Sequence, residues 1–430
     1  MKSTKLILSL LSLGLFVSQP LMAEEKAFEF TPGEDDGAES SILGIGFNPQ
    51  IYLNLSGLLD SDTPVSDLST NEHDPSRDYQ IHPIEMMSSF DFSDQLTGEI
   101  HAAFLQGSDE SWELELEQVK VTYDVNDVLS VTGGQLLNRF GFHNEYCAHA
   151  WDFVNQHLQS SRLLSEGHLI TRGVSLDYKP SSRWEFNITA GKARLHEHDH
   201  DHHGHGDEHG DHDDHEGEDH DDHEGEDHDG EEHADHDGDH EEHHMDADGI
   251  NISDWIASTD VRYYLDADQT TMISGSLAVG DNEFGTKTWL YGVGLQKLWG
   301  GHDHGDGLEF CEGSIKVKAE AIGRSAEVKH EDGDSDDVSD YGFYATIFYG
   351  LDEMTTISAR HGYVSELAEL ELEDRNRTSL AISRNLSSNV LARLQYDYNS
   401  SDSIEGEHAL WLQFKIAIGG SVDCHSGCNH

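Results

Sequence analysis

The chain has 430 residues and is strongly acidic, with 25 Lys and Arg against 85 Asp and Glu and a formal net charge of −60. This balance excludes nucleic acid as a partner, because phosphate recognition needs a basic surface. No segment after the N-terminal region holds about 18 consecutive apolar residues, so membrane-spanning helices are excluded as well. Cations are the expected partners.

The N-terminus has the pattern of a secretory signal peptide. Two lysines precede an apolar run over residues 6–17, and Ala23 supplies the small residue at the cleavage point. We therefore expect residues 1–23 to be removed on export and residues 24–49 to form a short periplasmic segment. The apolar run is too short to span a bilayer as a retained anchor.

Most of the mature chain alternates apolar and polar residues over stretches of about ten, which is typical of a membrane β-barrel. In one such stretch Leu394 and Tyr396 share a face, whereas Arg393 and Asp397 occupy the opposite one. In another, residues 112–124, the apolar face changes parity midway. A β-bulge near Glu117-Gln118 is therefore expected.

Sixteen such segments can be counted. They are residues 50–58, 84–92, 96–106, 112–124, 127–137, 172–178, 183–193, 254–266, 268–280, 286–299, 309–322, 338–350, 353–364, 375–385, 388–398 and 405–418. Every second link is short and turn-like, and the others include the long links 59–83, 138–171, 194–253 and 323–337. The prediction is an all-β transmembrane barrel over residues 50–418 in the cell outer membrane of a Gram-negative bacterium, with both chain ends on the periplasmic side. A soluble β-sandwich is the alternative.

Sixteen strands leave an aqueous channel rather than a packed core. The sequence contains no Gly-x-Ser-x-Gly or related nucleophile motif, so an enzyme is not expected.

The link over residues 195–250 has an unusual composition. Residues 196–248 contain 17 His and 26 Asp or Glu, with no Lys or Arg, and the tandem DDHEGEDH occupies 213–220 and 221–228. Such a polar segment cannot bury enough apolar area to offset the entropy of ordering, so we expect a disordered external loop. Imidazole and carboxylate groups bind zinc and related divalent ions, which predicts several weak, interchangeable metal sites. An acidic solubilising loop is the alternative. The candidate ligands are His196, His198, His200, His202, His203, His205, His209, His212, His215, His220, His223, His228, His233, His236, His240, His243 and His244.

The third external link, residues 138–171, is apolar and aromatic enough to be ordered. In 16-stranded porins the third loop folds into the lumen and narrows it. We expect this loop to form a constriction that selects metal ions. Its candidate metal ligands are His143, Cys147, His149 and Asp152.

This link also carries a resemblance to a known family. The residues concerned are Arg139-Phe140-Gly141, Asn144, His149-Ala150-Trp151-Asp152-Phe153, Arg162-Leu163-Leu164 and Gly167. They resemble the third-loop signature of zinc-regulated, porin-like outer-membrane proteins, often labelled zinc-regulated TonB-dependent outer membrane receptors, which also carry a His-rich loop and a His-containing tail. The resemblance implies a porin-like barrel that handles zinc.

Three features depart from that family pattern. Cys147-Ala148-His149 stands where a His-x-His pair is expected, which keeps a ligand but makes it softer and redox-sensitive. The chain continues past Gly419 instead of ending on an aromatic strand residue. Only residues 24–49 precede the first strand, so no plug domain is expected and passive diffusion is favoured over energy-coupled import.

Three smaller signals concern the rest of the chain. The periplasmic tail 419–430 gathers Cys424, His425, Cys428 and His430, which either chelate one ion or form a Cys424–Cys428 disulfide. The link over residues 300–306, with Cys311 after it, is a weaker candidate metal site. His73 and His82, isolated in the first external link, are expected to bind nothing.

The leading hypothesis is a cation-selective porin for zinc or a related divalent metal, with capture by the His-rich loop and selection by the third loop. A dense negative charge at the mouth concentrates cations, and weak, numerous sites let ions pass. The alternatives are a general diffusion porin whose loop only buffers metal, and a non-conducting surface protein that sequesters metal. The expected partners are membrane lipid, the transported metal ion, further copies in a homotrimer, and a periplasmic metal-binding protein; no organic cofactor is expected.

Overall fold

The computed structural model describes residues 40–42, 45–64, 70–71, 73–106, 111–194, 247–303, 308–309, 311–329, 335–370, 372–401 and 406–420. All of them belong to the compact unit that begins at Ser40.

Nearly all regular structure in this part of the chain is β-strand. The strands are β1 (Ser40–Ile42), β2 (Ile45–Ser61), β3 (Tyr79–Ser93), β4 (Leu96–Gln106), β5 (Trp112–Asn126), β6 (Leu129–Leu137), β7 (Ile170–Ser181), β8 (Trp184–Ala193), β9 (Trp255–Tyr264), β10 (Thr271–Asp281), β11 (Lys287–Trp299), β12 (His302–Asp303), β13 (Leu308–Glu309), β14 (Ile315–Lys329), β15 (Ser335–Asp352), β16 (Thr355–Val364), β17 (Arg375–Ser387), β18 (Val390–Ser400) and β19 (Glu407–Ile418). The helices are short: η1 (Ala148–Ala150), α3 (Leu158–Leu163), η2 (Ser165–Gly167), η3 (Ala247–Ile250) and η4 (Ala368–Leu370). None of these described helices is long and apolar enough to cross a bilayer.

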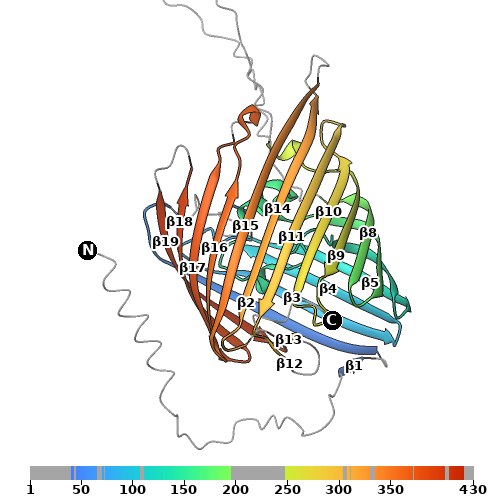
Figure 1. Cartoon of the computed structure of the whole chain (residues 1–430), viewed down its shortest axis with the longest axis horizontal. Helices are drawn as coiled ribbons and strands as arrows, with labels where there is room; N and C mark the ends of the chain where they lie inside the picture. Colours follow the sequence, from blue (N-terminus) through green and yellow to red (C-terminus); the bar gives the residue numbers. More distant parts are fainter. Residues whose placement is uncertain are drawn as a thin grey trace, which may run out of the picture. The chain divides into compact units, whose positions relative to one another are not determined.

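Sixteen long strands, β2–β11 and β14–β19, form one antiparallel sheet in which neighbours in sequence are neighbours in space (Figure 1). β19 pairs with β2, so the sheet closes on itself and leaves no edge. β1 extends this sheet as a three-residue partner of β2, and β12 and β13 pair only with each other. The predicted 16-stranded barrel is confirmed, and each predicted strand overlaps one of the sixteen.

One of the long links expected from the sequence is mostly strand. β14 continues to Lys329 and β15 begins at Ser335, so most of residues 323–337 extends the hairpin. The cause is apolar packing, because Val328 and Val338 are buried in a cluster with residues from two other links. Among the described acidic residues of β15, Asp336 and Asp337 are exposed, whereas Asp340 is buried and pairs with Arg324 at 2.6 Å.

The two faces of the barrel differ in polarity as the alternation predicted. On β18, Arg393 is 3% exposed and faces inward, whereas Leu394 is 41% exposed and faces outward. The outward face carries exposed large apolar side chains on most strands, among them Val293, Ile347 and Leu380. An apolar exterior around a polar interior is the arrangement that a lipid bilayer requires.

The parity change in β5 is a β-bulge. His101 of β4 pairs with Gln118, but the next residue of β4 pairs with Leu116, so Glu117 is the extra residue. As a consequence Glu117 and Gln118 are both buried on the inward side. The bulge predicted from the sequence is confirmed, and it adds one inward side chain to the wall.

Candidate metal sites in the barrel interior

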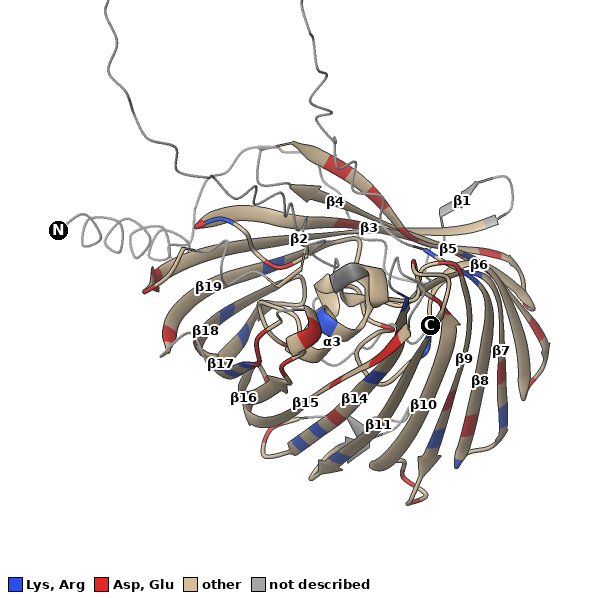
Figure 2. Cartoon of the chain, turned by 90° about the horizontal axis from the view of Figure 1, so that it is seen from above, with Lys and Arg blue, Asp and Glu red and all other residues tan. Residues whose placement is uncertain are grey.

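Residues 138–169, called loop 3 below, fold into the interior of the barrel. Figure 2 shows α3 inside the ring of strands, where it contacts β14, β15, β16 and β17. Most side chains of the loop are buried. Loop 3 therefore occupies the lumen, and its polar groups face those of the strand wall.

Apolar packing fixes both ends of loop 3. Phe140, Leu163, Leu164 and Leu169 join a buried cluster with inward residues of β9, β10, β11 and β14. These inward positions are unusual in a polar lumen, and they lie where the loop meets the wall. The aromatic and aliphatic residues that predicted an ordered loop therefore attach loop 3 to the barrel wall.

Basic side chains on the opposite wall bind the middle of loop 3 through its backbone. Four buried cations on β16–β19 donate hydrogen bonds to carbonyl oxygens. The contacts run from Arg360 to Asn155 (2.9 Å) and Gln156 (3.2 Å), from Arg377 to Gln156 (3.5 Å), from Arg393 to Trp151 (3.2 Å), and from Lys415 to His149 and Trp151 (2.7 Å each). Because charged donors make the stronger hydrogen bonds, these contacts set the height at which the loop crosses the lumen.

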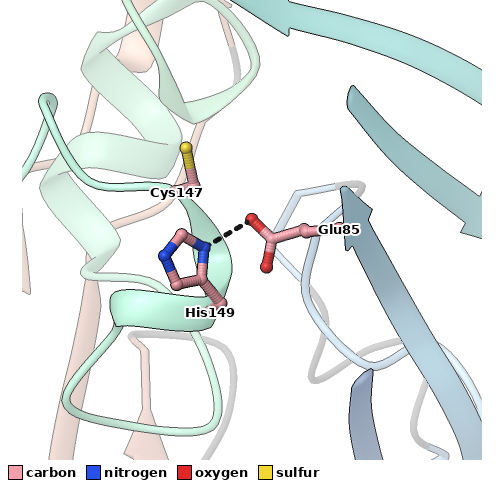
Figure 3. Close-up of side chains that lie close together, drawn as sticks. All are labelled: Glu85, Cys147 and His149. Atoms are coloured by element: carbon pink, nitrogen blue, oxygen red, sulfur yellow. Dashed lines mark hydrogen bonds and ion pairs between the residues drawn. The ribbon is translucent and has the colours of Figure 1, made fainter. Parts of the chain in front are cut away.

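The first candidate metal site, called the Cys147 site, consists of Glu85, Cys147 and His149 (Figure 3). One ligand atom from each side chain lies within 4.8 Å of the other two. Cys147 directly precedes η1 in loop 3 and His149 lies within it, whereas Glu85 points inward from β3. Sulfur, nitrogen and oxygen donors so arranged need only small movements to reach the distances of about 2.0–2.3 Å that zinc requires.

The side chains of this site are held by further contacts. Nδ1 of His149 lies 3.1 Å from Oε1 of Glu85, and its ring stacks on Tyr52 with centroids 4.2 Å apart. Sγ of Cys147 lies 3.5 Å from Nδ1 of His101, whose Nδ1 also faces the amide of Gln118 at 3.0 Å. His101 is thus a neighbouring imidazole beside a three-ligand site. The sequence predicted Cys147 and His149, but Glu85 and His101 were missed because only the barrel register brings them there.

The other two predicted loop-3 ligands do not join this site. The ring of His143 packs 4.6 Å from the ring of His157, and Oδ2 of Asp152 forms an ion pair with Lys318 at 3.3 Å. Burial lowers the pKa of His143 well below its ordinary value. Burial alone would raise the pKa of Asp152, but Lys318 and two other cations hold it below its usual value. Among the described residues, neither belongs to a group of three candidate ligands.

A second group of ligand-type side chains includes a histidine of the first link. His73, expected to bind nothing, is 3% exposed and lies against Glu115 and Glu117 of β5. Its Nε2 is 3.2 Å from Oε2 of Glu115 and 3.5 Å from Oε1 of Glu117. The parity change at the bulge was the only sequence signal pointing to this place.

Several predicted metal ligands lie outside the described residues. They are the histidines from His196 to His244 and the tail residues Cys424, His425, Cys428 and His430. The same holds for His304, and no side chain is described for His302. Cys147 and Cys311 do not form a disulfide with each other.

The closed sheet, the apolar exterior and the polar interior occupied by a folded loop define a porin-type β-barrel of the Gram-negative outer membrane. No protein-family model matches the chain, and no curated protein matches it. Among solved structures, the outer membrane channel DcaP of Acinetobacter baumannii is similar, with a TM-score of 0.53 and 11% sequence identity over 87% of this chain and 97% of that one. An anion-selective porin from Comamonas acidovorans is similar with a TM-score of 0.50 and 8% identity, over 87% of this chain and all of that one (100%). At such identities the likeness concerns the fold alone.

Proposed function

We propose that this protein is an outer-membrane channel that admits a divalent transition-metal cation, with zinc as the best-suited ion. One observation carries the proposal: a cysteine, a histidine and a glutamate converge inside the barrel at the Cys147 site, with donor atoms within 4.8 Å of one another. These donors suit borderline and soft ions rather than the alkali and alkaline-earth ions that oxygen ligands prefer. The metal is the transported substrate in this proposal, not a resident cofactor.

The charge distribution inside the barrel supports selectivity for cations. The fold leaves this property open, since an anion-selective porin is among its neighbours. Here Glu85, Glu99, Glu115 and Glu117 lie along the wall from β3 to β5, whereas the cations of β16–β19 are engaged with carbonyl groups of loop 3. A cation that enters therefore meets carboxylates on one wall, and on the other wall bases that stay charged but donate their hydrogen bonds to loop 3.

The His-rich segment and the tail extend the proposal beyond the barrel. Residues 195–248 join β8 to β9 at the same end of the barrel as loop 3, so metal collected by its histidines is delivered to the lumen entrance. On the opposite side, Cys424, His425, Cys428 and His430 would receive the ion and pass it to a periplasmic metal-binding protein. The zinc-regulated porin-like proteins that loop 3 resembles fit this scheme, as does a homotrimer.

The decisive experiment is single-channel recording in planar bilayers, in KCl with and without micromolar zinc. We expect zinc to interrupt the openings of the intact protein and of the matched control Cys311→Ser. In Cys147→Ser, we expect these zinc-dependent interruptions to be at least tenfold less frequent. A folded barrel that never opens would refute the channel and favour surface sequestration. Openings equally sensitive to zinc in both cysteine variants would refute the Cys147 site.

A second comparison tests capture. Removal of residues 195–248 is expected to lower zinc uptake by proteoliposomes at submicromolar zinc and to leave uptake at saturating zinc unchanged. Unchanged uptake at every concentration would favour the alternative of a general diffusion porin whose loop only buffers metal.

A further inference from the structure

We propose that the barrel wall holds a second metal site, formed by His73, Glu115, Glu117 and His168, which binds a zinc-like divalent cation independently of the Cys147 site. This inference goes beyond the proposed transport function, because metal binding here does not require that the barrel conduct. It rests on the geometry of four buried side chains from three separate parts of the chain.

The first three side chains already form a compact ligand set. Ligand atoms of His73, Glu115 and Glu117 lie within 4.8 Å of one another, and all three residues are buried. Imidazole and carboxylate groups are both zinc ligands, and zinc sites with three protein ligands keep an open position. Arg194 pairs with Oε1 of Glu115 at 2.7 Å and orients that carboxylate, leaving its other oxygen toward His73.

His168 lies outside this compact set but beside it, and in this proposal it moves toward the ion as a fourth ligand. Its ring lies edge-on to that of His73, with centroids 5.2 Å apart, and the residue is 5% exposed. The backbone of Tyr146 hydrogen-bonds the His168 ring, whereas Nε2 has no hydrogen-bond partner among the described residues. A metal-ligating histidine is commonly oriented by a backbone carbonyl on its other nitrogen.

Glu117 provides a second observation that points to a cation ligand. It is 2% exposed, and its Oε2 has no hydrogen-bond partner among the described residues. A buried carboxylate without adequate partners is costly, whereas a metal ion satisfies it. The β5 bulge makes Glu117 the extra residue of its strand, so the fold departs from a regular ladder at this side chain.

The alternative is a purely structural contact in which His73 anchors the first link to β5. A structural anchor explains the His73–Glu115 pair but not the unpartnered Nε2 of His168 or Oε2 of Glu117. Both residues lie beside His73, since the His168 ring is 5.2 Å from the His73 ring and Oε1 of Glu117 is 3.5 Å from Nε2 of His73. A single cation accounts for both orphaned atoms.

The two sites are neighbours on one row of the wall. Glu85 pairs in register with Ala103, and Ala103 pairs with Glu115, so the two glutamates are two strands apart. Adjacent strands lie about 4.8 Å apart, which separates the sites by roughly 10 Å. Ala103 is the small inward residue between them. Two moderate sites at this spacing would allow an ion to pass from one to the other.

The test is anomalous diffraction at the zinc edge from crystals of the full chain soaked in zinc. We expect an anomalous peak for a zinc ion bound by His73, Glu115, Glu117 and His168. This peak should be lost in Glu117→Gln and in His168→Gln, while any peak at the Cys147 site persists. The refined structures show directly whether each variant has folded. The soak uses zinc at about 1 mM, a concentration that also fills weak sites. Absence of a peak at these four residues overturns the inference, whatever occurs at the Cys147 site. Retention of the peak in both variants overturns it too. Failure of the proposed function would instead appear at the Cys147 site or in the conductance.

Discussion

Nζ of Lys415, on the last strand of the barrel, donates a 2.7 Å hydrogen bond to the backbone carbonyl of Trp151 in the middle of loop 3. The same ammonium group also donates to the carbonyl of His149, the histidine of the Cys147 site. The strand that closes the barrel therefore fixes the loop segment that carries the candidate ligands. A long-range backbone contact of this kind makes the geometry of the site depend on barrel closure.

Lys415→Met should loosen loop 3 without opening the barrel. The substitution removes at least two charged hydrogen bonds, each worth about 1.5–3 kcal/mol, while methionine fills a similar volume. We expect faster amide exchange in residues 146–156 and a higher, noisier single-channel conductance. Lys192→Met, at an exposed ion pair with Asp254, is the matched control. Equal exchange rates in the two variants would contradict the assigned role of Lys415.

His143→Gln should leave the zinc response nearly unchanged, although this residue was a predicted ligand. Its ring packs on His157 and Trp151, away from the Cys147 site. We expect the zinc concentration for half-maximal block to change by less than about twofold, against about tenfold (1.4 kcal/mol) or more in His149→Gln. Block curves recorded in the same bilayer system distinguish the two. A large effect of His143→Gln would mean that loop 3 rearranges when metal binds.

Zinc should protect Cys147 from alkylation. Cys147 is 1% exposed and its thiol lies beside Glu85 and His149, so a bound ion would both occupy the sulfur and cover it. In a protein whose other three cysteines are replaced by serine, we expect zinc to slow labelling by a small cationic thiol reagent at least tenfold. The protection should weaken in Glu85→Gln. Protection that is equal with magnesium would point to a general ionic effect rather than ligation.

Loss of lumen carboxylates should reduce the preference for cations. In the double variant Glu85→Gln and Glu117→Gln, the wall from β3 to β5 loses two buried negative charges, and the basic residues of β16–β19 remain. We expect the reversal potential in a KCl gradient to shift toward the chloride potential. Glu353→Gln, in an exposed turn, is expected to produce no shift. Cation preference that survives in the double variant would place the selectivity filter elsewhere.

Acidification below about pH 6.5 should destabilise loop 3 through His157. This ring stacks on Tyr344 with centroids 3.7 Å apart, and burial holds its pKa well below the ordinary value of 6.5. Because the folded state then binds fewer protons than the unfolded state, stability is present above pH 6.5 and declines as the pH falls. The pKa of Asp152 is lowered from 3.8, so its own contribution is lost only at still lower pH.

The measurement is amide exchange of residues 152–164 between pH 8 and pH 5, corrected for intrinsic rates. His157→Phe keeps an aromatic ring against Tyr344 but cannot titrate, so its profile should be flatter than that of the parent protein. Identical profiles for both proteins would assign the pH dependence to other groups.

The sequence was sufficient to predict the barrel because strand alternation is a local property. Each segment of about ten residues shows which side chains face lipid and which face the lumen, and the parity change at Glu117 even revealed the bulge. The link over residues 323–337 was wrongly predicted to be a loop because a local pattern does not show burial. Val328 and Val338 are buried through contacts with distant links.

The candidate sites were only partly accessible from sequence. Cys147 and His149 are close in sequence and could be recognised together, but Glu85 and His101 join them through pairing of β3 with β4 and the folding of loop 3 into the lumen. His73 looked isolated because its partners lie more than 40 residues away, on β5 and at the end of loop 3. Local alternation thus determined the barrel, and composition led to the expectation that it prefers cations. Strand register, barrel closure and the path of loop 3 decided which ligands meet, because those contacts join positions that no local pattern relates.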